Sequence, residues 1–359
     1  LSDWSREHKR ITIIVPDKTR RAGVHQFLAN LLDQLGGAEL RLLFANGTHA
    51  PQAKAEQRAI VTDAVFDTIT CRDHDSREHA GLVFKGTTPA GTPVHINRWV
   101  EEADGILAIG AVNYHYFAGF GGGVKLLVPG VAGYETAMRN HSRSIDPRTG
   151  GLHAGCRNGN LDGNPVYEDL ADAARLIRKP TFLLATVLDA RHRVVGAFAG
   201  DLFEAHRAAA EMVDSLYRVP IGERADLVIA SAGGYPKGVD MVQTHKALQR
   251  AFEAARPGGV IVLAAECRDG IGSDKLTEWM RMDADIFRER TVTHYARHAQ
   301  TAASIRERVT AARVYLVTSL EADLVRTFGM HPATSLEGAL ADARRHLPAD
   351  FTAFLIPDA

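Results

Sequence analysis

The chain has 359 residues, of which 45% are hydrophobic and 24% are charged, and its formal net charge at pH 7 is −1. This composition is typical of globular proteins, and the balanced charge excludes a general electrostatic attraction to nucleic acid or to an anionic membrane surface. No apolar run approaches the roughly 18 residues that a membrane-spanning helix requires.

The three cysteines, Cys71, Cys156 and Cys267, are an odd number and lie far apart in the sequence. Such a set argues against a disulfide framework and fits a reducing compartment. Residues 1–4 lack the charged and then apolar pattern of a secretory signal peptide. We therefore expect a cytoplasmic protein that binds neither nucleic acid nor membranes. No pattern in the sequence indicates an oligomeric state.

Short aliphatic runs of strand length recur along the chain. The runs that predict buried parallel strands are Ile11–Val15, Leu40–Ala45, Gly105–Gly110, Phe182–Val187, Leu227–Ser231, Val260–Ala264 and Val314–Thr318. Apolar residues at helical spacing lie between several of them, at Val24–Leu35, Pro165–Ile177 and Leu202–Leu216. Strands that alternate with helices predict an α/β fold with mostly parallel sheets.

A turn-rich connection at Arg218–Glu223 separates a predicted helix from a new strand. Domains of about 100–200 residues are the norm, so a chain of this length favours two of them. We predict two α/β domains, residues 1–218 and a smaller domain of residues 219–359, with the active-site cleft between them. The final strand, Phe351–Ile356, fits either domain.

Polar clusters directly follow four of the predicted strands, at residues 17–20, 46–49, 113–115 and 233–235. In open parallel sheets, ligands bind beyond the carboxyl ends of the strands. We therefore expect the four clusters to converge on one rim or cleft.

The first cluster reads Asp17-Lys18-Thr19-Arg20. Arg20 offers a planar, two-pronged donor for a carboxylate or phosphate, and Asp17 can orient a neighbouring histidine. The alternative is a helix N-cap, in which Asp17 or Thr19 satisfies free backbone N–H groups before the helix predicted at 24–35.

The second cluster contains the turn signal Asn46-Gly47, which places His49 beyond the end of a buried strand. A histidine in such a position can act as a general acid or base, because its pKa lies near working pH. It can equally be a loop histidine without a role in chemistry.

The third cluster opens a block that runs from Asn113 to His141 and holds His115, a glycine-rich turn and Lys125. The four glycines that let a ligand approach the backbone, as in a phosphate cradle, are Gly119, Gly121, Gly122 and Gly123. The spacing fits neither a Walker A loop nor the GxGxxG dinucleotide fingerprint. Lys125 can pair with a phosphate or act as a nucleophilic amine. A flexible surface loop is the alternative.

The second domain opens with a glycine turn at Gly233-Gly234, followed by Tyr235. Gln243 and Lys246 are three residues apart, so they share a helix face. That face can reach into a cleft, or it can be an ordinary solvated surface.

Taken together, these segments resemble the nickel-dependent lactate racemase family over most of the chain. The matching motifs are DKTR (17–20), ANGTH (45–49), NYHYFAGFGGGVKLLVPG (113–130), NH (140–141), LDGNPVYED (161–169), GGYP (233–236), QTHK (243–246) and AAECRDGIG (264–272). Each motif is weak alone, and their shared order and spacing carry the resemblance.

The resemblance implies an isomerase, a racemase or epimerase of a 2-hydroxy acid, that works by reversible hydride transfer to a nickel-pincer nucleotide. That cofactor is pyridinium-3-thioamide-5-thiocarboxylic acid mononucleotide with bound nickel. Lys125 matches the lysine that attaches it covalently, and His141 matches the protein ligand of nickel. The enzymes that make the cofactor are the implied maturation partners.

By the same resemblance, His49 and His115 are the two acid/base residues, and two such residues suit a reaction that must serve both enantiomers. Asp17 and Arg20 match the pair that supports catalysis and grips the substrate carboxylate. The residues that the resemblance assigns to substrate binding from the second domain are Gln243, Lys246 and Tyr235. Those assigned to cofactor binding besides Lys125 are Thr19, Asn46, Gly119, Gly121, Gly122 and Gly123.

The sequence departs from the family pattern at Arg21-Ala22-Gly23, where a proline is expected, and at Gly121, where a serine often stands. These departures leave the identity of the 2-hydroxy acid open. One alternative function is a non-catalytic carrier of a nucleotide or metal, which the presence of both His49 and His115 disfavours. Another is a nicotinamide-dependent hydroxy-acid dehydrogenase, which lacks support because the dinucleotide fingerprint is missing.

Overall fold

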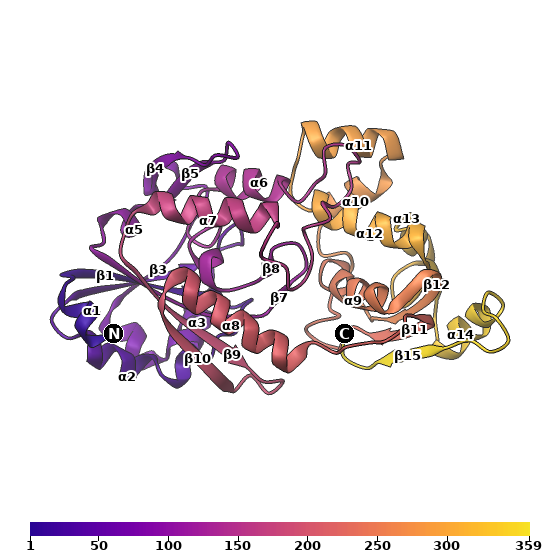
Figure 1. The fold of residues 1–359 in the computed structure, drawn as a ribbon, viewed down its shortest axis with the longest axis horizontal. Helices are drawn as coiled ribbons and strands as arrows, with labels where there is room; N and C mark the ends of the chain where they lie inside the picture. The colour runs from indigo at the N-terminus through magenta and orange to yellow at the C-terminus, as the bar shows by residue number, and fades with distance from the viewer. The chain divides into compact units, whose positions relative to one another are not determined.

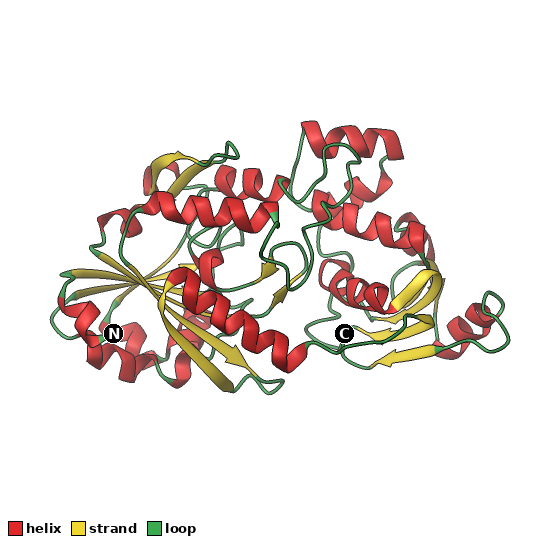
Figure 2. Ribbon diagram, viewed as in Figure 1, coloured by secondary structure: helices red, strands yellow, loops and turns green.

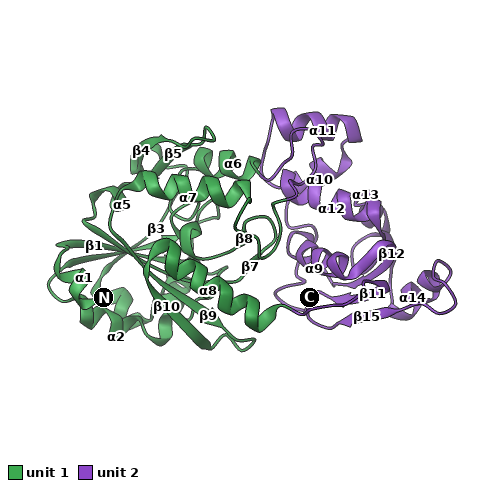
Figure 3. Cartoon of the chain, in the orientation of Figure 1, with its two compact units in different colours: residues 1–143, 155–218 green, residues 144–154, 219–359 purple.

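The computed structural model describes residues 1–359, which form two compact units (Figure 3). The first unit comprises residues 1–143 and 155–218, and the second comprises residues 144–154 and 219–359. The short segment 144–154 therefore leaves the first unit and belongs to the second. Ile145 and Leu152 of this segment bridge to each other and pack with the apolar core of the second unit.

The first unit is built on a six-stranded sheet in the order β10-β9-β6-β1-β2-β3 (Figure 1). Its strands are β1 (Arg10–Pro16), β2 (Glu39–Ala45), β3 (Thr70–Asp73), β6 (Gly105–Ala111), β9 (Thr181–Leu188) and β10 (Val194–Asp201). All neighbours are parallel except β9 and β10. Two small antiparallel pairs accompany the sheet: β4 (Leu82–Thr87) with β5 (Pro93–Asn97), and β7 (Tyr114–His115) with β8 (Gly119–Phe120).

Helices cover both faces of this sheet, as Figure 2 shows. The α-helices are α1 (Ser2–Arg6), α2 (Leu28–Leu32), α3 (Lys54–Val61), α4 (Asp63–Thr68), α5 (Arg98–Glu102), α6 (Tyr134–Ser142), α7 (Pro165–Ile177) and α8 (Leu202–Tyr217). The 3-10 turns are η1 (Val24–Gln26), η2 (Asp33–Leu35), η3 (His79–Gly81) and η4 (Gly123–Leu126). Successive strand residues pack on opposite faces: Ile14 joins the core with α7 and α8, and Ile13 joins the core with α2 and α3.

The second unit has a five-stranded, fully parallel sheet in the order β14-β13-β12-β11-β15. Its strands are β11 (Ala225–Ser231), β12 (Ala255–Ala264), β13 (Arg313–Val317), β14 (His331–Ala333) and β15 (Ala353–Ile356). Its helices are α9 (Met241–Ala254), α10 (Asp274–Arg281), α11 (Ala284–Thr293), α12 (Ala299–Ala311), α13 (Ala322–Thr327) and α14 (Leu336–Arg344). The final strand, which the sequence left unassigned, pairs with β11.

The predicted α/β class with mostly parallel sheets is confirmed, because every apolar run that predicted a strand forms one. The single helix predicted at Val24–Leu35 is wrong. The segment breaks into η1, α2 and η2, and Phe27 between them adopts φ −143° and ψ −11°, outside the helical region. Packing of Val24 and Leu28 onto the sheet takes precedence over the weak helical preference of the local sequence. No helix has the length and apolarity that crossing a bilayer requires.

Candidate active site

Three of the four predicted polar clusters meet at one edge of the first unit's sheet. Strands β6, β1 and β2 are adjacent and parallel, so the segments that follow them leave the sheet at the same edge. These segments carry residues 113–115, 17–20 and 46–49. The fourth cluster, 233–235, follows β11 in the separate sheet of the second unit. The expectation of one shared rim therefore holds for three clusters within one sheet.

Asp17 and His49 form the polar centre of this edge. Asp17 is 2% exposed, and its Oδ2 lies 2.6 Å from His49 Nδ1. Its other oxygen, Oδ1, accepts hydrogen bonds from the Thr19 backbone N–H (3.1 Å) and hydroxyl (2.6 Å). The alternative N-cap role is wrong, since the first helical turn begins after Gly23 and the Asp17 carboxylate serves His49 and Thr19.

The charge on Asp17 is stabilised by its neighbours. Burial alone would raise the pKa of Asp17, but the hydrogen bond and charge of His49, the Thr19 hydroxyl and the charge of Arg20 outweigh it, so the pKa lies below its ordinary value. Asp17 is therefore a carboxylate at neutral pH. Arg20 is exposed and donates from Nη1 to the Thr19 carbonyl (3.0 Å) and hydroxyl (3.1 Å), which orders the end of its side chain.

The Asn46-Gly47 turn connects His49 to the loop after Lys125. The Gly47 N–H donates to the Gly130 carbonyl (2.8 Å), and the His49 N–H donates to the Asn46 carbonyl (3.0 Å). Gly47 has φ +56°, a conformation that glycine adopts without steric cost. Asn46 itself is 1% exposed. The turn therefore fixes the backbone that carries His49.

The glycine-rich turn is packed against the rest of the first unit. A Cβ on Gly123 would lie 2.2 Å from Cγ of His206, and one on Gly122 would lie 2.5 Å from the Ala111 carbonyl oxygen. Gly119 and Gly121 are equally confined, by Asn160 and Asn113. The alternative of a flexible surface loop does not fit these contacts. Packing within the unit accounts for the glycines, whether or not the turn also receives a phosphate.

The ring of Phe117 lies at the centre of three predicted site residues. It is 3% exposed, and its centroid lies 4.6 Å from the His115 ring, 5.1 Å from the His141 ring and 5.4 Å from Lys125 Nζ. Both ring pairs are close to perpendicular, which is a favourable aromatic geometry. Phe117 thus gathers an imidazole from β7, an amine from η4 and an imidazole from α6.

This apolar setting changes the charge state of two of these groups. Burial, with the positive charge of Arg20, lowers the pKa of Lys125 to about 7. Burial, with the charges of Lys125 and His49, lowers the pKa of His141 to about 3. At neutral pH the His141 imidazole is therefore neutral, and a substantial fraction of Lys125 is the neutral, nucleophilic amine.

Sequence reasoning missed His206 and did not predict the central position of Phe117. His206 on α8 contacts Gly123, and its Nε2 lies 3.2 Å from the Gly121 carbonyl oxygen. Burial lowers the pKa of His206 to about 4, so it is neutral. From the sequence, Phe117 is only one of several aromatic candidates for a pocket wall, with no position assigned, and no local signal marks His206. Tertiary packing alone brings both to the site.

The predicted substrate-binding residues of the second unit lie in two places. Gln243 and Lys246 are near the start of α9, and Tyr235 follows the carboxyl end of β11. Asp240 caps α9 by accepting from the Gln243 N–H (2.7 Å), and Lys246 Nζ donates to Gln243 Oε1 (2.7 Å). The two side chains therefore share a helix face. Tyr235 is exposed, with the Arg268 guanidinium 4.3 Å from its ring centroid. Their roles toward a substrate stay predictions.

The chemistry of His141 and Lys125 is compatible with the nickel-pincer nucleotide that the resemblance implies. No group of three or more His, Cys, Asp or Glu side chains in residues 1–359 is arranged to hold a metal ion. A metal here would take most of its ligands from another molecule, and a neutral imidazole such as His141 suits the remaining position. The neutral fraction of Lys125 suits covalent attachment.

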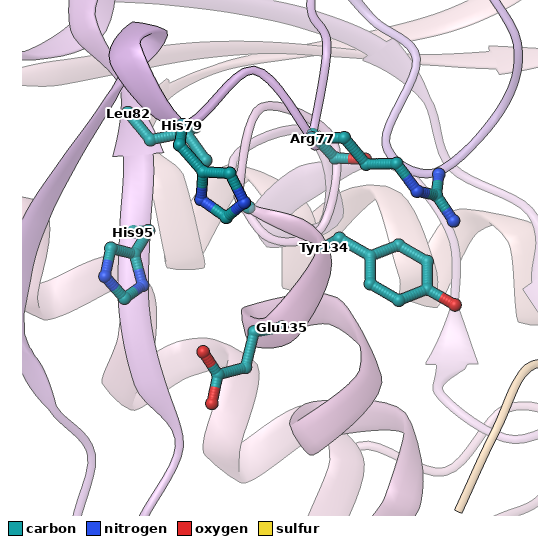
Figure 4. Close-up of a pocket in the computed structure, with 8 residues that line it drawn as sticks. Arg77, His79, Leu82, His95, Tyr134 and Glu135 are labelled. Atoms are coloured by element: carbon teal, nitrogen blue, oxygen red, sulfur yellow. The ribbon is translucent and has the colours of Figure 1, made fainter.

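The pocket drawn in Figure 4 is a different feature of the first unit. It has a volume of about 330 Å³ and is lined by residues of η3, β4, β5 and the start of α6, including His79, His95 and Glu135. None of the predicted site residues lines it. It shares α6 with His141, but lies at the opposite end of that helix.

Comparison with known proteins links the chain to one family. Residues 1–151 match the family described as lactate racemase N-terminal domain, and residues 222–359 match the lactate racemase C-terminal domain. The lactate racemase of Thermoanaerobacterium thermosaccharolyticum is 33% identical over 289 residues, which are 79% of this chain and 66% of that protein. The lactate racemase of Lactiplantibacillus plantarum is 33% identical over 280 residues, 76% of this chain and 64% of that protein. The aligned region thus spans slightly less than two thirds of each relative.

Solved structures extend the likeness to the whole fold. The lactate racemase apoprotein from T. thermosaccharolyticum superposes with a TM-score of 0.92 at 30% identity, covering 99% of this chain and 87% of that chain. A protein from Thermotoga maritima superposes with a TM-score of 0.73 at 20% identity, covering 99% and 94%. The second likeness concerns the fold alone.

Proposed function

The chain belongs to the lactate racemase family, and we propose that it racemises or epimerises a 2-hydroxy acid by reversible hydride transfer to a nickel-pincer nucleotide. One observation carries the proposal: the carboxylate-held imidazole of His49 lies at the same sheet edge as the cluster around Phe117. Lactate is the first candidate substrate, because both curated relatives are named for it.

Hydride removal suits this substrate class. The hydrogen on Cα of a 2-hydroxy acid is weakly acidic beside a carboxylate, so direct deprotonation would create a costly carbanion. Loss of a hydride together with the hydroxyl proton gives a planar 2-keto acid, which can be reduced on either face. Lys125 and His141 would hold the nickel-pincer nucleotide, and the chemistry it supplies when bound is reversible acceptance of the hydride.

The two histidines suit proton transfer in opposite senses. An Nδ1–H of His49 that donates to Asp17 leaves Nε2 as the basic nitrogen, ready to take the hydroxyl proton. His115 accepts the Ala118 N–H at Nδ1 (3.3 Å), so its neutral form carries the proton on Nε2. To return a proton to the substrate oxygen, His115 would act as the imidazolium and become neutral in the step, since a neutral imidazole is too weak an acid. In one direction, His49 would take the hydroxyl proton of one enantiomer, and His115 would give a proton to the hydroxyl oxygen of the other. In the opposite direction, the two histidines would exchange these roles.

Arg20 completes the arrangement. Its guanidinium is exposed at the sheet edge beside Asp17, and it can bind the substrate carboxylate through two parallel hydrogen bonds. Such binding would fix Cα and the hydroxyl relative to His49, which is how positioning lowers the barrier of the chemical step. Gln243, Lys246 and Tyr235 are the residues we propose for substrate contact from the second unit.

The test uses protein produced together with the cofactor-making enzymes, assayed on enantiopure 2-hydroxy acids in deuterated water. We expect stoichiometric nickel, a mass increase on Lys125, and inversion in which the product keeps the original hydrogen on Cα. Full uptake of deuterium at Cα would indicate proton abstraction instead. Nickel-loaded protein of the right mass that inverts no acid of a broad panel would contradict the proposed activity.

A further inference from the structure

Asp169 on α7 is a buried carboxylate that the chemistry above does not use. It is 2% exposed, and no lysine or arginine forms an ion pair with it. Three side chains donate to it instead: Thr88 Oγ1 (2.5 Å), Thr92 Oγ1 (2.9 Å) and Asn140 Nδ2 (2.9 Å). A buried charge without a cation is costly unless hydrogen bonds satisfy it, so these contacts depend strongly on one another.

The three donors come from two separate elements. Thr88 and Thr92 belong to the turn between β4 and β5, where the Thr92 N–H also donates to Thr88 Oγ1 (3.1 Å). Asn140 belongs to the last turn of α6, and its Nδ2 donates in addition to the Val166 carbonyl (3.0 Å) in the first turn of α7. Asp169 therefore ties α6 to α7 and to the β4–β5 turn, which Figure 1 shows beside these helices.

Asn140 directly precedes His141, so what holds Asn140 also sets the direction of His141. Helix α6 has nine residues, and a helix this short is marginal alone, so tertiary contacts decide its orientation. A turn or shift of its last residues would move the His141 ring relative to Phe117, whose centroid lies 5.1 Å away.

We propose that Asp169 is a positioning residue: acting through Asn140, it fixes the last turn of α6 and thereby orients the His141 imidazole toward nickel. The inference rests on the proposed function for the role of His141. Residues that orient a metal ligand without touching the metal commonly change metal affinity 10- to 100-fold when they are replaced.

The test variant is Asp169→Asn, which preserves size and removes the charge. In the apoprotein we expect faster amide hydrogen exchange in the last turn of α6, with exchange in β1 and β2 unchanged. In the loaded protein we expect nickel to pass to a chelator about 10-fold faster, with the adduct on Lys125 retained. Both measurements are made well below the unfolding temperature.

A matched control is Asp226→Asn in the second unit. Asp226 is also a buried carboxylate, 7% exposed, which accepts from the Thr352 N–H and hydroxyl (both 2.8 Å) and pairs with Arg256. This variant should lower the unfolding temperature without changing nickel loss. Asn140→Ala should reproduce the effect of Asp169→Asn, and the double variant should add little, because both act through one contact.

The outcomes separate this inference from the proposed function. If the wild-type protein loads nickel and Asp169→Asn changes neither amide hydrogen exchange in α6 nor the rate of nickel loss, the inference is overturned and the proposed function is not. A wild-type chain that takes up no nickel overturns the proposed function and this inference with it. If Asp169→Asn does not fold, Thr92→Val removes one donor, keeps the carboxylate, and carries the same expectation with a smaller effect.

Discussion

Two histidines of the first unit, His49 and His141, for which we propose different roles, lie in opposite surroundings. His49 is partly exposed and is held by a charged partner, Asp17, at 2.6 Å. His141 lies against the ring of Phe117, and burial lowers its pKa to about 3. A carboxylate that orients an imidazole favours proton transfer, whereas an apolar setting that keeps it neutral favours metal ligation. These two settings are the basis of the different roles that we propose for His49 and His141.

The largest effect expected from this contrast comes from exchanging each histidine for alanine. His141→Ala should lose both nickel retention and turnover, because it removes the proposed ligand. His49→Ala should reduce turnover by about 100-fold or more and keep nickel, because it removes only an acid/base group. Nickel content and racemisation rates of the two variants, measured side by side, decide the point. Loss of nickel from His49→Ala would contradict the assignment of different roles to His49 and His141.

Asp17→Asn tests the charged side of the comparison. We expect kcat/KM to fall by about 100-fold or more with nickel retained, since the amide no longer stabilises or orients a protonated His49. The pKa of Asp17 is depressed in the folded protein, so its contribution to stability is present above its ordinary pKa and is lost as pH falls through the folded value. Acid unfolding of the variant should therefore show a weaker pH dependence. An identical acid-unfolding curve would argue against the pair.

Labelling of Lys125 tests the apolar surroundings that it shares with His141. Because burial and Arg20 lower its pKa to about 7, labelling of the apoprotein by an amine-reactive ester should rise with pH and level off near pH 7 to 8 at this residue. Mass spectrometry of the Lys125 peptide measures it. In Arg20→Gln the plateau should move to higher pH, and in urea it should move further, to the range of an ordinary lysine. A wild-type profile that matches the one in urea would contradict this account.

Phe117→Leu should have the smallest effect. The variant keeps an apolar side chain but loses the ring that contacts His115, Lys125 and His141. We expect a loss of about 1–2 kcal/mol in the free energy of unfolding, measured by denaturant titration, and a modest loss of turnover. Phe198→Leu, a partly buried phenylalanine of β10, offers a control that should affect stability without affecting turnover.

Much of the fold could be predicted because short runs of apolar residues indicate buried strands. Ile11–Val15 is apolar at nearly every position, as a strand covered on both faces must be, and it forms β1. The prediction of a single helix at Val24–Leu35 is wrong although its apolar residues do have helical spacing. Contacts with the sheet decide the conformation of this segment. Local pattern predicts an element only where tertiary packing does not compete with it.

The candidate site also has a part that the sequence predicts and a part that it does not. The clusters after β1, β2 and β6 could be predicted to meet, because adjacent parallel strands end at one edge. From the sequence alone, Asp17 can be either a helix cap or the partner of a histidine, and only the 2.6 Å contact with His49 distinguishes the two roles. Asp169 and His206 lie on helices distant in sequence from the residues they hold, so no local spacing could assign them a role.

The segment 144–154 determines how the chain can be divided. The backbone passes from one unit to the other at 143/144, 154/155 and 218/219, so a cut at 218 would not yield the two units. A fragment of residues 1–218 would retain Ile145 and Leu152 without the core they pack into, and a fragment of residues 219–359 would lose the Gly150 carbonyl that accepts from Thr291. The second unit is assembled from two stretches of sequence, so the first can be produced without residues of the second only if residues 143 and 155 are joined by a short bypass.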